Sequence, residues 1–182
     1  MKMDIWFFNL INSHRYIFLD VVAYIFSNYL FIFLGISFLL LFICFSHNIE
    51  RKIKNLCIVG FSFLSQLILI NGILKNIFYR PRPFLVLPQT YLLGPVSTGS
   101  SFPSNHTAIV ASIIIAFVLL NKKYWPVLFV ILLVGWSRIY SGMHWPSDVF
   151  FSIIISIGCA FFSFWLYQKW EKKWSSKIVA KK

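Results

Sequence analysis

Long apolar stretches separated by short charged segments constrain the fold of this chain more than any other feature. Five of them approach or exceed the length of a membrane-spanning helix, and they cover residues 27–45, 53–78, 104–120, 124–140 and 146–167. Only 12% of the 182 residues are charged, whereas a soluble domain carries about a quarter. Because a backbone in lipid has to satisfy its own hydrogen bonds, we expect an all-α, polytopic transmembrane helix bundle that forms one domain over residues 1–182.

Residues 1–26 precede the five stretches and leave two alternatives open. Apolar residues at 5–7, 10 and 11 form one face of a short helix, and the polar run Asn12–Arg15 interrupts it before residues 16–26, which carry Asp20. Neither piece alone reaches the roughly 20 residues that a span needs. We interpret the segment as an interfacial amphipathic helix, with one kinked sixth span as the alternative.

The net charge of +12 is concentrated in three clusters. They lie between the first and second stretches (51–54), between the third and fourth (122–123) and in the C-terminal tail (169–182). Basic residues favour the cytoplasmic side, so we place these segments and the C-terminus on the cytoplasmic side of a bacterial-type inner membrane. The clusters flank apolar runs and form no single basic face, so we predict no nucleic-acid binding.

Three basic residues close to the second stretch break this rule, because they fall on the outer side. They are Lys75, Arg80 and Arg82. An arginine at the end of a span usually extends its charge to the lipid headgroups, and we interpret Arg80 in that way. We predict a functional role for Lys75 and Arg82 instead, since both belong to a larger set of polar residues on the same side.

The alternation of spans and loops places three polar motifs at the outer end of the bundle, at residues 75–83, 101–106 and 137–148. Together they gather three cations, two histidines and a carboxylate, namely Lys75, Arg82, Arg138, His106, His144 and Asp148. Three cations offset a phosphate dianion, and arginines bind its oxygens bidentately. One histidine can attack phosphorus while the other protonates the departing oxygen. A bond from Asp148 to His144 would fix the histidine tautomer.

Ser104 and Asn105 add backbone chemistry to this set. Ser104 is a candidate N-cap for the helix over 104–120, and the N–H of Asn105 would point at an anion from the helix start. Zinc binding by the histidines is disfavoured, because the surrounding cations would repel it. We therefore expect a phosphate site that needs neither metal nor cofactor, with the helix dipole and the cations in their place.

The three motifs, Lys-x6-Arg-Pro, Pro-Ser-x-His and Ser-Arg-x5-His-x3-Asp, resemble the signatures of the type 2 phosphatidic acid phosphatase superfamily, whose site architecture vanadium haloperoxidases share. The resemblance covers residues 75–148. It implies the following roles: phosphoryl binding by Lys75, Arg82, Arg138, Ser104 and the N–H of Asn105; nucleophilic attack by His144 through a phosphohistidine, with Asp148 orienting it; and general acid, then base, catalysis by His106. The family usually has glycine where this chain has Asn105.

The expected function is that of an integral membrane phosphatase whose site faces the outer side of the membrane. Its partners are the bilayer and a lipid phosphate monoester or diphosphate. The resemblance suggests undecaprenyl diphosphate, phosphatidylglycerophosphate, phosphatidate and the 1-phosphate of lipid A. Two alternatives stay open: a lipid phosphotransferase with the same site, and a non-catalytic lipid-binding protein.

Overall fold

The computed structural model describes residues 2–29 and 49–179, which contain helices and no strand. Residues 2–29 form two helices, α1 (Lys2–Asn12) and α2 (Ile17–Asn28). The rest comprises α4 (Ile49–Leu67), the π-helix η1 (Ile68–Leu74), α5 (Lys75–Ile77), α6 (Pro83–Val86), α7 (Asn105–Leu120), the 3₁₀-helix η2 (Lys122–Val127), α8 (Leu128–Tyr140) and α9 (Pro146–Val179). Most of the predicted stretch 27–45 lies outside the described residues.

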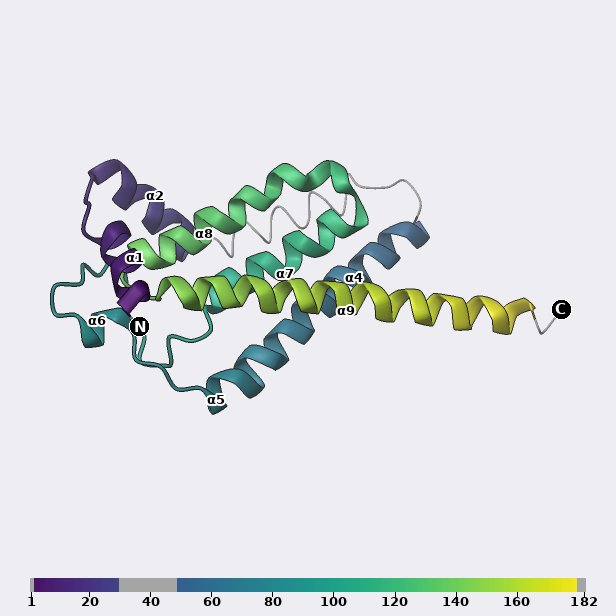
Figure 1. The fold of residues 1–182 in the computed structure, drawn as a ribbon. Coiled ribbons are helices and arrows are strands. Elements are labelled where there is room, and N and C mark those ends of the chain that lie inside the picture. The colour runs from purple at the N-terminus through teal and green to yellow at the C-terminus, as the bar shows by residue number, and fades with distance from the viewer. Residues whose placement is uncertain (1, 30–48, 180–182) are drawn as a thin grey trace.

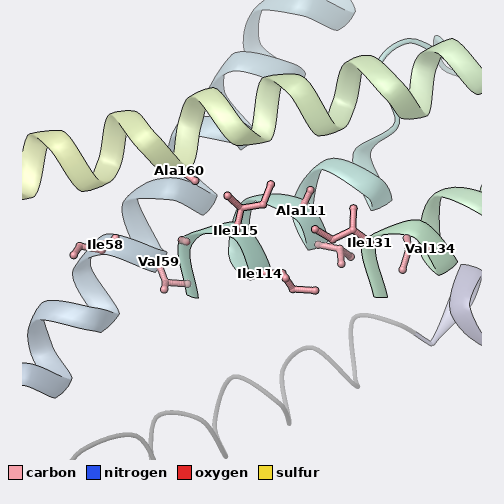
Figure 2. Packing of buried hydrophobic residues seen from close by; sticks show 10 residues of the cluster. Ile58, Val59, Ala111, Ile114, Ile115, Ile131, Val134 and Ala160 are labelled. Atoms are coloured by element: carbon pink, nitrogen blue, oxygen red, sulfur yellow. The ribbon is translucent and has the colours of Figure 1, made fainter. Parts of the chain in front are cut away.

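Helix α7 is the centre of the bundle and packs against α4, α8 and α9. Its sequence is apolar on every side, as expected for a helix without a solvent-facing surface. Figure 2 shows the buried cluster that joins these four helices, with Ile58 and Val59 from α4, Ala111, Ile114 and Ile115 from α7, Ile131 and Val134 from α8, and Ala160 from α9. The core therefore consists of aliphatic side chains interlocking around α7.

Within the part of the chain that the structure describes, two helical segments are long and apolar enough to cross a membrane, Lys52–Ile77 and Pro146–Glu171, and α2 and α7 are shorter apolar helices. Large apolar side chains remain exposed along α9, among them Phe150, Phe161 and Trp165. An exposed apolar surface of this extent marks contact with a membrane or another protein. All-helical architecture is thus confirmed for the described residues.

The helix bounds differ from the predicted stretches in three places. The fourth stretch begins as η2, which contains Pro126, and the α-helix starts only at Leu128. Proline cannot donate the backbone hydrogen bond of an α-helix interior, which explains the tighter start. Helix α9 continues to Val179 through the first part of the predicted tail, because neither proline nor glycine interrupts residues 168–179. Helix α4 begins at Ile49, before the predicted start at residue 53. The break between α1 and α2 lies close to the polar run Asn12–Arg15 that the sequence indicated.

Close helix contacts and buried hydroxyls stabilise the bundle. A Cβ atom on Gly135 of α8 would lie 2.5 Å from Cγ1 of Val149 on α9, so only glycine permits this approach. Ser62 of α4 donates to the backbone oxygen of Ser112 on α7 at 2.8 Å. Small residues and interhelical hydrogen bonds of this kind are typical of packing within membranes, where lipid offers polar groups no partners.

The N-terminal helices lie at the end of the bundle where α8 ends and α9 begins, whereas α9 ends on the opposite side (Figure 1). The buried Asn12 donates to the backbone oxygens of Tyr91 and Tyr140, and its own side-chain oxygen accepts from the N–H of Tyr91. The guanidinium of Arg15 lies between the rings of the same two tyrosines, 3.5 and 4.2 Å from their centroids. The corner between α1 and α2 therefore fixes the long loop before α7 to the end of α8.

Candidate active site

His144 lies in the turn between α8 and α9 and is 2% exposed. Its Nδ1 atom is 2.7 Å from the backbone oxygen of Ser101. A carbonyl oxygen only accepts, so Nδ1 carries the proton and donates it to Ser101. The other ring nitrogen, Nε2, then carries no proton, and its lone pair accepts a hydrogen bond from Nη1 of Arg82 at 3.4 Å. The turn thus presents an unprotonated imidazole nitrogen that is bonded to a cation.

The carboxylate of Asp148 does not make the predicted hydrogen bond to His144. Its Oδ2 atom lies 3.8 Å from Nδ1, beyond hydrogen-bond distance, and accepts instead from the backbone N–H of Trp145 at 2.9 Å. Asp148 is in the first turn of α9, as predicted, but the turn directs its oxygens to the helix start. The carbonyl of Ser101 therefore fixes the tautomer, and Asp148 acts on His144 as a nearby buried charge.

Arg80 is not a headgroup anchor, contrary to the interpretation from sequence. Its Nη1 donates to Oδ1 of Asp148 at 2.6 Å and to the hydroxyl of Ser147 at 2.7 Å, and its Nη2 bonds to Asp4 of α1. The reason is the path of the loop, which turns Arg80 inward over the ring of Trp145. The sequence held one signal for this role, namely that Arg80 departs from the predicted pattern of the basic clusters.

Arg82 is almost completely buried and organises the loop around His144. Its Nε donates to the backbone oxygen of Gly99 at 2.9 Å, Nη1 to that of Met143 at 3.0 Å, and Nη2 to Ser97 and Ser100. These four partners fix the plane of the guanidinium beside Nε2 of His144. The predicted phosphate-binding residue therefore also supports the loop that carries its neighbours.

The remaining predicted cations and the second histidine come from three other helices and share this region. The charge of Lys75 in α5 interacts with those of Arg82, Arg138 and Asp148, and His106 in the first turn of α7 interacts with Arg138, His144, Lys75 and Arg82. Arg138 of α8 donates to Ser27, while its buried Nε has no partner in the described residues. The structure thus brings all six predicted charged and histidine side chains to one end of the bundle.

Ser104 occupies the N-cap position of α7, as predicted, but its side chain does not cap the helix. The hydroxyl lies 3.1 Å from that of Thr107, and the backbone N–H donates to the hydroxyl of Ser152 at 2.8 Å. Ser104 is fully buried because α9 packs over the start of α7 and supplies that hydroxyl. Its contribution to an anion site is therefore limited by partners that it already has.

Asn105, which stands where the resembled family has glycine, contacts the π-helix η1. Its Nδ2 atom donates to Oδ1 of Asn71 at 2.8 Å, and its own Oδ1 has no partner in the described part of the chain. π-helical turns often occur at functional sites, and η1 leads directly into Lys75. The asparagine therefore connects the start of α7 to the segment that positions a predicted phosphate-binding residue.

Electrostatics keep His144 neutral. Burial, followed by the charges of Arg138 and Arg82, lowers the pKa of His144 from 6.5 to about 4, against the opposing effect of Asp148. Within residues 2–29 and 49–179, no group of three or more His, Cys, Asp and Glu side chains is placed to hold a metal ion. The arrangement combines a neutral imidazole, a second histidine and three cations, a set that suits attack on a phosphoryl group.

Residues 55–172 match the family model of the PAP2 superfamily. The chain is 33% identical over 155 residues to undecaprenyl-diphosphatase BcrC of Bacillus subtilis (strain 168), which covers 84% of this chain and 78% of that protein. It is also 33% identical over 115 residues to an undecaprenyl-diphosphatase of Sulfolobus acidocaldarius, covering 62% of this chain and 54% of the relative.

Two solved structures share the fold. LpxE from Aquifex aeolicus superimposes with a TM-score of 0.70 and 33% sequence identity, over 88% of this chain and 93% of that one. A PAP2-type phosphatidylglycerolphosphate phosphatase from Bacillus subtilis superimposes with a TM-score of 0.63 and 21% identity, over 94% of this chain and 86% of the other.

Proposed function

The chain belongs to the PAP2 superfamily and is a membrane phosphatase of that type, and we propose that it hydrolyses a polyprenyl diphosphate such as undecaprenyl diphosphate. Support for this substrate comes from relatives named undecaprenyl-diphosphatases, two of them 33% identical to this chain. Support for the chemistry comes from the site. The observation that carries it is the unprotonated Nε2 atom of His144, which accepts a hydrogen bond from the guanidinium of Arg82 at 3.4 Å.

The first proposed step transfers the terminal phosphoryl group to the enzyme. Nε2 of His144 attacks phosphorus, and the bond from phosphorus to the leaving oxygen breaks as the new P–N bond forms. His106 gives its proton to the leaving oxygen, which departs as the lipid monophosphate. Lys75, Arg82 and Arg138 bind the phosphoryl oxygens and offset the negative charge of the transition state.

The second proposed step releases the enzyme. His106, now neutral, takes a proton from water, whose oxygen attacks phosphorus and displaces Nε2 of His144. Inorganic phosphate leaves, and both histidines return to their starting protonation states, so that atoms and charges balance. The bond from Nδ1 of His144 to Ser101 persists through both steps and keeps the ring in one orientation.

We further propose that the site faces the outer side of a bacterial inner membrane and that the C-terminus is cytoplasmic. The three basic clusters of the sequence support this orientation. We propose that the bundle and its loops form one catalytic domain, because the residues of the site come from α5, α7, α8, the loop before α6 and the start of α9. Five spans, with α1 and α2 at the interface, remain our proposed membrane arrangement.

The test is phosphate release by the purified protein in detergent, measured with undecaprenyl diphosphate, phosphatidylglycerophosphate, phosphatidate and lipid A. We expect the diphosphate to be preferred. His144→Ala should abolish turnover with every substrate, and His106→Ala should lower it by about 10²–10⁴-fold, because general acid catalysis has that magnitude. A diphosphate has the better leaving group, so the loss in His106→Ala should be smaller for it than for a monoester.

A trapping experiment separates the roles of the two histidines. An acid-labile, alkali-stable phosphoenzyme should accumulate in His106→Ala and be absent in His144→Ala. The reverse result would exchange nucleophile and acid. Phosphate that appears only as a new lipid phosphate when acceptor lipid is added would identify a phosphotransferase, and the absence of turnover with the whole panel would reject the proposed activity.

A further inference from the structure

The first residues of the chain reach the site through a network of side chains. Both oxygens of Asp4 in α1 contact the start of α9: Oδ1 accepts from the backbone N–H of Ser147 at 3.0 Å, and Oδ2 from its hydroxyl at 2.6 Å. Oδ2 also binds Arg80, whose other terminal nitrogen binds Asp148. One guanidinium therefore bridges two carboxylates that are 144 positions apart in the sequence.

This network leaves Asp148 little freedom. Arg80 holds Oδ1, and the backbone N–H of Trp145 holds Oδ2, which stays 3.8 Å from Nδ1 of His144. The Asp148 side chain is 0% exposed, and those of Asp4 and Arg80 are 10% and 26% exposed. Shielding from water makes these contacts stronger than ion pairs at the surface.

Asp4 and Arg80 both remain charged within this arrangement. Burial alone would raise the pKa of Asp4, but the hydrogen bonds from Ser147 and Arg80 outweigh it and lower the pKa. Burial alone would lower the pKa of Arg80, but Asp4 and Asp148 outweigh it and raise the pKa. Both shifts favour the charged forms of Asp4 and Arg80, on which their ion pair depends.

We propose that Asp4 is a positioning residue of the phosphatase reaction, acting through Arg80 to hold the buried carboxylate of Asp148 at its distance from His144. The inference rests on the proposed function. The carboxylate of Asp4 competes with Asp148 for one guanidinium, and so sets how much negative charge His144 experiences. Helix α1 becomes part of the active site without touching the substrate.

The charged and titratable groups around His144 are Asp148 of α9, Arg138 of α8, Arg82 of the loop before α6, and His106 of α7. Of the four, Asp148 alone favours the protonated imidazole, and Arg80 partly neutralises it. Removing the charge of Arg80 should raise the pKa of His144, whereas removing that of Asp4 should not raise it. Simple loosening of the fold would admit water and raise the pKa in both cases.

The experiment measures kcat, KM and the acid limb of kcat/KM for undecaprenyl diphosphate with Asp4→Asn, Arg80→Gln and the double variant. We expect Asp4→Asn to lower kcat by roughly tenfold or more, as loss of a supporting partner commonly does, with KM unchanged. The double variant should match Arg80→Gln alone, because the amide introduced by Asp4→Asn can still bond to Ser147 and loses only the charge that binds Arg80. The acid limb should move to higher pH in Arg80→Gln and should not move upward in Asp4→Asn.

Asp20→Asn is the matched control, because Asp20 also comes from the N-terminal helices and also pairs with an arginine, Arg15, at 3.2 Å. It should lower thermal stability without moving the acid limb. Should Asp4→Asn not fold, Asp4→Glu keeps the charge with one more methylene, and we expect it to lower kcat at constant KM.

Three results would overturn the inference. The first is a wild-type kcat in Asp4→Asn or, where only Asp4→Glu folds, in Asp4→Glu. The second is additive losses of kcat in the double variant, and the third is an acid limb raised equally by both single substitutions. Failure of the proposed function itself looks different, since the wild-type protein would then not hydrolyse the lipid at all.

Discussion

His144 should remain neutral at pH 5 in the folded protein, where an ordinary histidine would be almost fully protonated. The side chain is buried, and burial together with Arg138 and Arg82 lowers its pKa to about 4, against the opposing effect of Asp148. Nucleophilic attack needs the neutral form, so the direction of this shift favours catalysis. The perturbation to apply is acidification from pH 7 to pH 5 and then to pH 3.

The magnitude follows from the two pKa values. At pH 5, a group with a pKa of 4 is about 90% neutral, and one with the usual value of 6.5 is about 3% neutral. The difference of pKa corresponds to roughly 3 kcal/mol of free energy that disfavours the imidazolium in the folded site. Because the pKa is lowered, the nucleophile is lost only as the pH falls below about 4.

The assay is a pH titration of ¹⁵N-histidine-labelled protein in detergent micelles by NMR. The chain has four histidines, and the signal that disappears in His144→Ala belongs to His144. Its nitrogen shifts also report the tautomer: protonated Nδ1 bonded to Ser101 and unprotonated Nε2 at pH 5. As a test of the cause, Arg82→Gln should move the midpoint upward, because it removes a neighbouring positive charge.

A titration midpoint near 6.5 would refute this reasoning, and so would a proton on Nε2 in the neutral form. The first result would mean that water and counter-charges reach the ring, so that burial does not control its protonation. The second would leave no lone pair on the nitrogen beside Arg82, and nucleophilic attack from that position would have to be abandoned.

Three further predictions concern stability, metal and topology. Gly142→Ala should lower the free energy of unfolding in detergent by at least about 1–2 kcal/mol, because Gly142 has φ +76° and a Cβ there would lie 2.6 Å from the backbone oxygen of Tyr91. The control is Gly158→Ala, which should not lower it, because a Cβ on Gly158 would meet no atom within 4 Å. Exhaustive EDTA treatment should leave activity unchanged and vanadate should inhibit competitively, whereas activity restored only by added zinc or magnesium would contradict the cationic site. In a background without native cysteines, an impermeant thiol reagent on intact cells should label Gln89→Cys but not Ser176→Cys, and the opposite labelling would reverse the orientation.

The sequence alone was sufficient for the class of protein and for grouping the residues of the candidate site. Long apolar stretches in lipid favour helices, because a helix satisfies the backbone hydrogen bonds within one segment. Alternation of spans and loops then brings the three motifs to one end, so Lys75, His106 and Arg138 could be grouped without coordinates. The start of α7 at Asn105 and of α9 at Pro146 also followed from local signals, a serine at the N-cap position and a proline in the first turn.

The atoms that meet within the site could not be predicted, since each such contact depends on how distant loops pack. The partner of Nδ1 in His144 is a backbone oxygen 43 positions away, and backbone oxygens are alike in any sequence. Asp148 is four residues from His144 and looked like its partner, but the helix start and Arg80, 68 positions away, take its oxygens instead.

Asp4 is the clearest example of a residue whose role only the tertiary structure reveals. The chain has only five acidic residues against seventeen basic ones, and Asp4 is one of the five. No local pattern connects it to a motif more than 70 positions later. Periodicity and motif spacing encode which side chains are present and which end of the bundle they reach. Only the tertiary structure decides that α1 lies against α8 and α9, because that docking depends on Phe8 packing beside Trp145 and on Asn12 reaching the end of α8.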